Sequence, residues 1–243
     1  MFSVLDMFTI GVGPSSSHTV GPMCAAQAFA SSLEESGAVS RVGRIRVVLY
    51  GSLSLTGLGH GTDRAILAGL EGNVPATVDT DYLLSVRERC AHDGTIHVNG
   101  TNAIAYDDDG DMVFDRWKRL APHPNGMRFQ AFDAQGNIID EQVWYSIGGG
   151  FIRRGRIDDA LISNHEQTPA SSQSPEDSGN DEAAEYGDGV PYPFVSCDGL
   201  IDLCRKHHLS IADVVWANET ARRSPQEVRD RLTRIWNVMS HCI

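Results

Sequence analysis

Residues 45–50, IRVVLY, lead directly into the glycine-rich stretch GSLSLTGLGHGTD at residues 51–63. A short run of β-branched and apolar residues predicts a buried strand. The next run, DRAILAGL at residues 63–70, predicts a helix that carries an acid in its first turn, where the helix dipole favours negative charge. A strand, a loop and a helix in this order predict an α/β unit.

The flanking segments extend this unit in both directions. TVGPMCAAQAFASS at residues 19–32 has apolar residues at helical spacing after a start rich in serine and threonine, which predicts a helix. MRFQAFD at residues 127–133 and IIDEQVWYSI at residues 138–147, separated by AQGN, predict a β-hairpin. We therefore predict a compact α/β (α+β) domain over residues 1–160.

A change in composition marks the end of this domain. His165–Gly189 holds seven acids, no Lys or Arg, and almost no large apolar residue. Such a segment cannot bury enough surface to offset the entropy of ordering it. We predict a flexible acidic linker over residues 161–190.

The sequence pattern of residues 191–243 predicts helices and no strands. Apolar residues recur at i, i+3 and i+4 in residues 195–207, 210–221 and 224–239. SPQE at residues 224–227 predicts a capping box with Ser224 as N-cap and Glu227 at N3. We interpret these helices as the start of a longer, truncated helical domain, because their apolar faces have no further chain to pack against.

Composition argues against several classes of protein. Of the 243 residues, 41% are hydrophobic, enough for a buried core, and 20 Lys and Arg face 32 Asp and Glu, a net charge of −12. Nucleic acid is therefore not an expected partner. No run of about 18 apolar residues predicts a membrane span. Five scattered cysteines, without CxxC spacing, indicate a reducing cytoplasm.

The first candidate site is GVGPSSSHTVGP at residues 11–22. Glycines flank three serines and a histidine just before a predicted helix, so backbone N–H groups and hydroxyls could converge on an anion such as a carboxylate. His18 would add a proton acceptor and donor beside them. The alternative is that Ser17 or Thr19 is only a helix N-cap and the glycines are turn residues.

The second candidate is His60, in the glycine-rich stretch. Glycines at positions 51, 57, 59 and 61 allow close backbone approach, and the loop follows a buried strand, where α/β sheets tend to place their sites. The stretch contains neither a GxxxxGK(S/T) phosphate loop nor a GxGxxG fingerprint. The alternative is a flexible loop with an incidental histidine.

The third candidate is APHPNGM at residues 121–127. Two prolines hold His123 in an extended loop, and Asn125-Gly126 predicts a tight turn before a strand. The imidazole and the amide, two residues apart, could bind one small polar ligand. YSIGGGF at residues 145–151 adds three consecutive glycines at a strand end, which suit close backbone approach or a hinge.

Five motifs together carry a resemblance to a known family. PSSSHT at residues 14–19, YGSLSLTGLGHGTD at 50–63, HPNGM at 123–127, YSIGGGF at 145–151 and VPYPF at 190–194 resemble, in order and spacing, the iron–sulfur-dependent bacterial L-serine dehydratases (L-serine ammonia-lyases). The resemblance implies an N-terminal β domain similar to the allosteric substrate-binding domain of some D-3-phosphoglycerate dehydrogenases, then a helical α domain that holds a 4Fe-4S cluster.

The resemblance also implies an activity and residue roles. The family eliminates water from L-serine to give pyruvate and ammonia without pyridoxal phosphate. By the match, His60 is the base that removes the Cα proton, while His123 and Asn125 hold the substrate and its hydroxyl. The pocket lining and the carboxylate contacts fall to Ser15, Ser16, Ser17 and His18.

The cluster ligands of the family lie downstream of residue 243, so we assign no metal ligand to Cys24, Cys90, Cys197, Cys204 or Cys242. The resemblance is compatible with a homodimer or with a complex with a separate α-domain chain. Two other interpretations stay open. The chain could be a serine-binding regulatory domain without activity of its own, or a metal hydrolase that uses His18, His60 and His123, although HExxH and HxH spacings are absent.

Overall fold

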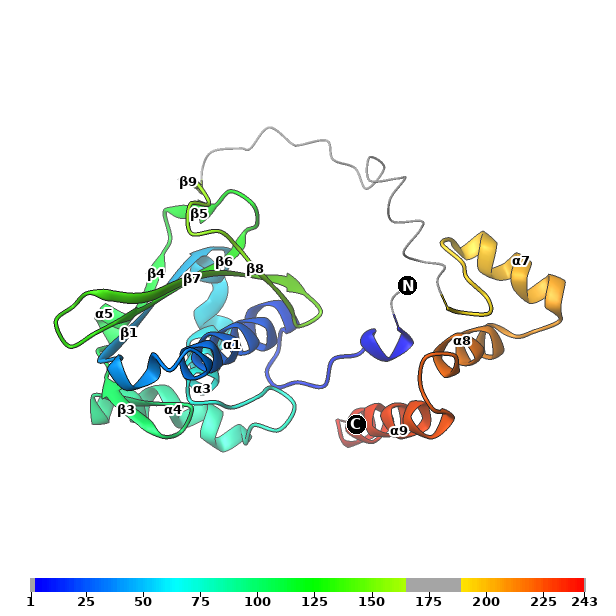
Figure 1. The fold of residues 1–243 in the computed structure, drawn as a ribbon, viewed down its shortest axis with the longest axis horizontal. Coiled ribbons are helices and arrows are strands. Elements are labelled where there is room, and N and C mark those ends of the chain that lie inside the picture. Colours follow the sequence, from blue (N-terminus) through cyan, green and yellow to red (C-terminus); the bar gives the residue numbers. More distant parts are fainter. Residues whose placement is uncertain (1–2, 165–188, 243) are drawn as a thin grey trace. The chain divides into compact units, whose positions relative to one another are not determined.

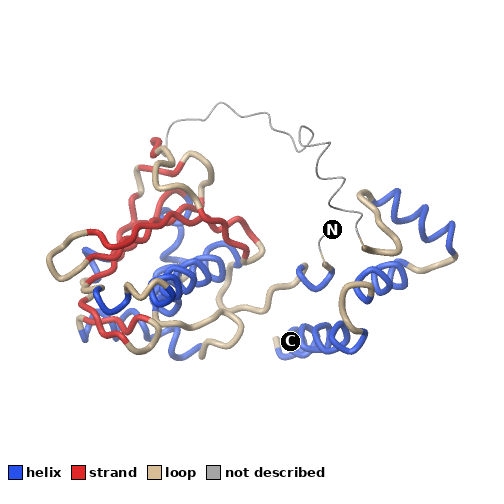
Figure 2. Tube along the Cα trace, in the orientation of Figure 1, coloured by secondary structure: helices blue, strands red, loops and turns tan. Residues whose placement is uncertain are grey.

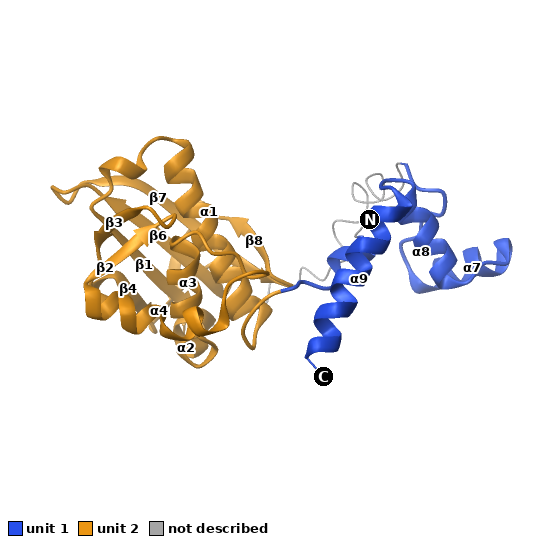
Figure 3. Ribbon diagram, turned by 90° about the horizontal axis from the view of Figure 1, so that it is seen from below, with its two compact units in different colours: residues 1–10, 168–243 blue, residues 11–167 orange. Residues whose placement is uncertain are grey.

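The computed structural model describes residues 3–164 and 189–242, and the chain divides into two compact units (Figure 3). We call Gly11–Gln167 the sheet unit, and Met1–Ile10 with Thr168–Ile243 the helical unit. The first domain was predicted to begin at residue 1, whereas the structure groups the first ten residues with the C-terminal helices. Most of the predicted linker, residues 161–190, lies outside the described residues.

A seven-stranded mixed sheet forms the frame of the sheet unit. Its order is β2-β3-β1-β6-β7-β8, with β4 also paired to β1. Strands β3 and β4 run parallel to β1, whereas β6 and β7 continue the sheet on the other side in antiparallel fashion. The strands are β1 (Arg44–Gly51), β2 (Thr95–Val98), β3 (Asn102–Ala105), β4 (Met112–Asp115), β6 (Asn125–Phe132), β7 (Ile138–Gly148) and β8 (Phe151–Arg154).

Helices cover one face of this sheet (Figures 1 and 2). Helix α1 (Gly21–Glu35) packs on β7 and on α3 (Thr62–Leu70), and α4 (Thr80–Asp93) packs on α3. Phe29 of α1 stacks on Phe129 of β6 with ring centroids 5.2 Å apart, and both rings belong to the main core. This arrangement confirms the predicted α/β (α+β) class.

Side chains of β1 alternate between two cores, as expected for a strand that is buried on both faces. Val47 and Leu49 enter the main core, whereas Val48 and Tyr50 pack on the opposite face with Leu120. Leu120 belongs to β5 (Lys118–Leu120), which pairs with β9 (Leu161–Ser163) in a separate two-stranded sheet. The first residues of the predicted linker are therefore a strand.

The central elements match the sequence predictions. The predicted strand, second helix and hairpin correspond to β1, α3 and the β6–β7 pair. The predicted first helix differs at its start, because Ser16–Val20 forms a π-helical turn before α1 begins at Gly21. Asn125 and Gly126 are not a turn: they are the first residues of β6, paired with Gly51 and Tyr145 on the neighbouring strands.

The helical unit contains α7 (Cys197–His207), α8 (Ile211–Thr220) and α9 (Pro225–His241). Among residues 3–164 and 189–242, the structure has no helix that is both long and apolar enough to span a bilayer. Ser224 caps α9 as predicted, but the full capping box forms at α8, between Ser210 and Asp213. The carboxylate of Glu227 instead pairs with Arg231 at 3.2 Å.

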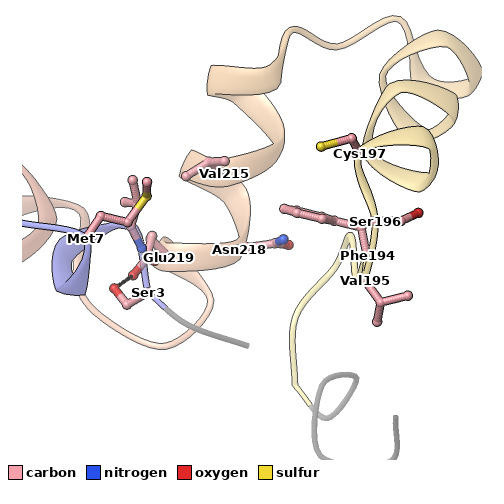
Figure 4. Close-up of a pocket in the computed structure, with 10 residues that line it drawn as sticks. Ser3, Met7, Phe194, Val195, Ser196, Cys197, Val215, Asn218 and Glu219 are labelled. Carbon is pink, nitrogen blue, oxygen red and sulfur yellow. Dashed lines mark hydrogen bonds between the residues drawn. The ribbon is translucent and has the colours of Figure 1, made fainter. Parts of the chain in front are cut away.

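The N-terminal segment is attached to α8 of the same unit. Ser3 Oγ and the backbone N–H of Val4 both donate to the buried carboxylate of Glu219, at 2.8 Å each (Figure 4). Arg223 also donates to this carboxylate at 2.8 Å. One side chain of the last third of the chain thus fixes the beginning of the chain.

Candidate active site

Three neighbouring strand ends meet at one end of the sheet. Gly51 at the end of β1 pairs with Asn125 at the start of β6, and Ser146 lies near the end of β7. Asn125 Nδ2 donates to the carbonyl of Ser146 at 3.2 Å, and Ser146 Oγ donates to the carbonyl of Ser17 at 2.7 Å. The sheet therefore brings the serine-rich turn and the HPNG segment together.

The serine-rich turn is held by its own hydroxyls. Ser15 is the N-cap of the π-helical turn and accepts the backbone N–H of His18 at 3.1 Å. The His18 ring lies between two hydroxyls, with Nδ1 2.9 Å from Ser17 Oγ and Nε2 3.1 Å from Ser52 Oγ. Ser16 lies in the same turn, with an exposed side chain. The cap is thus Ser15, not Ser17 or Thr19.

His60 lies on a short 3-10 helix, Gly57–His60, that follows helix α2 (Ser52–Thr56). Its Nδ1 is 2.9 Å from the carbonyl oxygen of Thr56. A carbonyl can only accept, so Nδ1 carries the proton of the neutral ring and Nε2 is left as a free base. The rings of His60 and His18 lie close together, with centroids 4.9 Å apart. The glycine-rich stretch is therefore helical, not a flexible loop.

His123 has the opposite tautomer. The backbone N–H of Asn125 donates to His123 Nδ1 at 3.1 Å, so the proton of the neutral ring is on Nε2. The neighbouring Pro124 carbonyl accepts the backbone N–H of Ser52 at 2.9 Å, which connects this segment to the His18 side of the site. The site thus contains one imidazole with a free acceptor nitrogen and one with a free donor.

Gly51 allows the end of β1 to pass close to the HPNG segment. Its φ of 58° and ψ of −129° are strained for any residue with a side chain. A Cβ at this position would lie 2.2 Å from the Pro124 carbonyl oxygen. Only glycine therefore lets Ser52 approach the HPNG segment closely enough to bind it.

The environment keeps two of the histidines neutral. Burial lowers the pKa of His18 below the ordinary 6.5, and a proton on the neighbouring His60 would lower it further. Burial also lowers the pKa of His123, with a second contribution from the positive charge of Arg153. Both shifts favour the uncharged form of His18 and of His123 at neutral pH.

A cavity of about 330 Å³ opens beside His60, large enough for a small metabolite. Its walls combine the glycine-rich stretch, the start of the serine-rich segment and α4. Arg64 and Arg87 are among the lining residues, and Arg87 is paired with the buried Asp63. The lining residues are Gly13, Pro14, Thr19, Leu58, Gly59, His60, Gly61, Asp63, Arg64, Leu83, Leu84 and Arg87.

The structure brings six of the seven predicted site residues into one hydrogen-bonded arrangement. These are Ser15, Ser17, His18, His60, His123 and Asn125, of which His60 joins through its ring contact with His18. Sequence reasoning missed Ser52 and Ser146, which connect the segments. The sequence signal that could have revealed them is their position, because Ser52 directly follows the glycine that ends β1 and Ser146 lies near the end of β7.

A metal or cluster has no matching donor set in the described part of the chain. No group of three or more His, Cys, Asp or Glu side chains there is placed to hold an ion. The cysteines lie apart: Cys90 is buried in α4, whereas Cys197 is exposed at the start of α7. The described residues therefore do not fit an iron–sulfur cluster, and we derive no step through one.

A second cavity, of about 380 Å³, lies within the helical unit (Figure 4). It contains none of the predicted site residues and is mainly apolar. Its walls are Ser3, Val4, Met7, Phe194, Val195, Ser196, Cys197, Val215, Asn218 and Glu219. We assign it no part in the chemistry of the histidine site.

The chain is similar to known proteins over almost its whole length. A family model described as "Serine dehydratase beta chain" matches residues 3–156. The L-serine dehydratase of Streptomyces coelicolor is 41% identical over 241 residues, 99% of this chain and 49% of that protein. L-serine dehydratase 1 of Escherichia coli is 38% identical over 247 residues, 100% of this chain and 48% of that protein.

A relative from Haemophilus influenzae, also named L-serine dehydratase, is 34% identical over 244 residues, 100% of this chain and 49% of that protein. The chain thus spans about half the length of the curated relatives it matches. The family match covers the whole described sheet unit up to residue 156, including every residue of the histidine site. The chain therefore belongs to the serine dehydratase beta chain family.

Proposed function

We propose that this chain supplies the acid–base groups of an L-serine dehydratase, a lyase that converts L-serine to pyruvate and ammonia. The observation that carries the proposal is the pair of opposite tautomers, His60 with a free Nε2 acceptor and His123 with a free Nε2–H donor. Elimination of water from serine needs one group of each kind, because a proton leaves Cα while the hydroxyl leaves Cβ.

In this proposal His60 Nε2 takes the Cα proton. The Cα–H electron pair forms the Cα=Cβ double bond as the Cβ–O bond breaks, and His123 Nε2–H gives its proton to the departing hydroxyl, which leaves as water. The remaining aminoacrylate tautomerises to an imine, and water hydrolyses the imine to pyruvate and ammonia. General acid and base groups of this kind contribute about 10²- to 10⁴-fold each.

The serine-rich turn and Asn125 would hold the substrate. Hydroxyls of Ser15 and Ser17, 3.4 Å apart, and His18 lie at the start of a helical segment, where donors suit a carboxylate. Asn125 would keep the substrate hydroxyl near His123. The exposed Ser16 would add a further contact at the rim of the site.

The proposal assigns the cofactor to residues outside this chain. A 4Fe-4S cluster bound there would supply Lewis-acid chemistry. Pyridoxal phosphate needs a lysine for its Schiff base. The chain has two lysines, Lys118 on β5 and Lys206 on α7, and both are exposed and outside the histidine site. The proposed chemistry uses neither lysine.

The test is pyruvate formation from L-serine, after anaerobic reconstitution with iron and sulfide. The assay uses this chain together with the region that corresponds to the remaining half of the matched relatives. We expect His60→Ala to lower kcat by about 10²- to 10⁴-fold. His241→Ala is the matched control, because His241 Nδ1 also contacts a carbonyl four residues earlier at 2.9 Å, but in α9. Wild-type turnover in His60→Ala would contradict the assignment of the base.

A further inference from the structure

Two threonines connect the backbones of the neighbouring histidines reciprocally. Thr19 Oγ1 donates to the carbonyl of His60 at 2.9 Å, and Thr62 Oγ1 donates to the carbonyl of His18. Thr19 follows His18 directly, and Thr62 lies two residues after His60. Each threonine therefore binds the histidine of the other segment. We call these two hydrogen bonds the threonine cross-tie.

Both threonines are buried. Thr19 is 1% exposed and Thr62 is fully buried. Removal of either hydroxyl therefore takes away a buried hydrogen bond between the two segments. The cross-tie acts in a region of low dielectric, where hydrogen bonds define geometry most strongly.

The two threonines of the cross-tie lie at the starts of two helices that pack tightly on each other. Thr19 is in the turn that opens α1, and Thr62 is the first residue of α3. These two helices approach so closely that a Cβ at Gly69 of α3 would lie 2.3 Å from the Met23 carbonyl of α1. Because the helices cannot slide past each other freely, the hydrogen bonds transmit their fixed positions to the two histidines.

We propose that Thr19 and Thr62 are positioning residues, whose cross-tie holds the His60 ring at its distance from His18 and so aims the base at the substrate. The proposal rests on the proposed function for the identity of the base. An alternative role is simple: each threonine would only fill space in the core. The two roles predict different effects of valine, which keeps the shape, and of serine, which keeps the hydroxyl.

The kinetic test compares these substitutions in the assembled enzyme. We expect Thr19→Val and Thr62→Val to lower kcat by about 10- to 100-fold with KM changed by less than about threefold, because a displaced base affects the reaction step. Thr19→Ser and Thr62→Ser should recover kcat to within about threefold. Thr220→Val is the matched control, since in the part of the chain that the structure describes Thr220 Oγ1 binds only carbonyls of its own helix, Trp216 and Ala217.

A second measurement does not depend on activity. In the 243-residue chain with isotope-labelled histidine, the 4.9 Å separation of the rings predicts an NMR cross-peak between ring protons of His18 and His60. The valine variants should lose this cross-peak, and the serine variants should keep it. This result would hold even if the wild-type enzyme produced no pyruvate, which would contradict the proposed function alone.

Two outcomes would overturn the cross-tie. One is that valine variants with native melting temperature keep both kcat and the cross-peak. The other is that serine and valine variants lose activity equally, which would assign the threonines to packing. A valine variant that fails to fold is replaced in the comparison by Thr→Ala at the same position, with Thr→Ser again as the rescue.

Discussion

The hydroxyl of Ser146 connects two segments that are 129 residues apart in sequence, because it donates to the Ser17 carbonyl. Ser146 is fully buried. We expect Ser146→Ala to destabilise the sheet unit by about 1–3 kcal/mol, since a buried hydrogen bond is lost without replacement by water. It should also raise KM for L-serine, because the serine-rich turn loses an anchor.

Urea unfolding measures the stability change, and Ser85→Ala is the matched control. Ser85 is exposed on α4, and its hydroxyl binds carbonyls of its own helix, Asp81 and Tyr82. The control should change stability by less than about 0.5 kcal/mol. Equal effects of the two substitutions would show that the Ser146 hydrogen bond has no special role.

The lowered pKa values of His18 and His123 predict a pH dependence of stability. In the unfolded chain both rings take up protons near the ordinary pKa of 6.5, whereas in the folded chain they do so only at lower pH. The unfolded state therefore binds more protons as pH falls from 6.5 toward the lowered values, and stability falls over this window. Glu71 and Asp108 have pKa values lowered from 4.5 and 3.8, so their protonation reduces stability only in more acidic solution.

Urea midpoints measured on both sides of pH 6.5 test this expectation. The double variant His18→Asn with His123→Asn should show a flatter pH dependence in that window. An unchanged slope in the double variant would mean that other groups take up the protons.

At the scale of elements, the junction of β1 and α2 depends on one backbone conformation. Gly51→Ala introduces a Cβ at a φ of 58°, 2.2 Å from the Pro124 carbonyl. We expect a loss of about 1–3 kcal/mol from backbone strain, with a further loss from the clash. Gly37→Ala is the control for strain alone, because Gly37 has a φ of 68° but open space around its Cβ position.

Thermal unfolding of the two variants separates clash from strain. Gly37→Ala should cost only about 1–2 kcal/mol, and Gly51→Ala should also lower pyruvate formation, since Ser52 would move away from Pro124. If the two variants melted at the same temperature, the close approach of Gly51 to the HPNG segment would not limit the fold.

The elements that sequence analysis predicted are those with a strong local pattern. β1, α3 and the β6–β7 hairpin have long apolar or alternating runs, so their identity does not depend on partners. β2, β3 and β5 have only three or four residues, and their pairing depends on distant strands, which a local pattern cannot specify. The assignment of Asn125-Gly126 to a turn was wrong for this reason, because ladder pairing with β1 and β7 outweighed local turn preference.

The residues of the candidate site also fall into two groups, those that the sequence pointed to and those that only the fold reveals. The histidines and the serine-rich turn stand out by composition, so their sequence context is enough to make them candidates. Ser52, Ser146 and the threonine cross-tie emerge only when the strand register and the two helix starts are known. Common residue types such as Ser and Thr carry no signal of their own until the fold places them against a particular carbonyl.

At the scale of the whole molecule, Glu219 holds the beginning of the chain on α8. It is 7% exposed and accepts from Ser3, Val4 and Arg223. We expect Glu219→Ala to destabilise the helical unit by about 1–3 kcal/mol, because three donors lose their shared acceptor. The sheet unit should be unaffected, since its core contains none of these residues.

Hydrogen exchange followed by mass spectrometry can resolve the two units. Peptides from residues 3–10 and from α8 should exchange faster in Glu219→Ala, whereas β1 and β6 should exchange as in the wild type. Glu88→Ala, at an exposed acid of α4, is the control and should change neither set. Equally faster exchange in β1 would indicate that the units unfold together.

The attachment of Ser3 to Glu219 also sets an order of events during synthesis. The two residues are 216 positions apart, so at about 5–20 residues per second the ribosome makes Glu219 roughly 10–40 s after Ser3. The sheet unit, Gly11–Gln167, is complete before then. Ser3 and Val4 are consequently without their acceptor while the sheet unit forms, and they reach their final position only after α8 has been made.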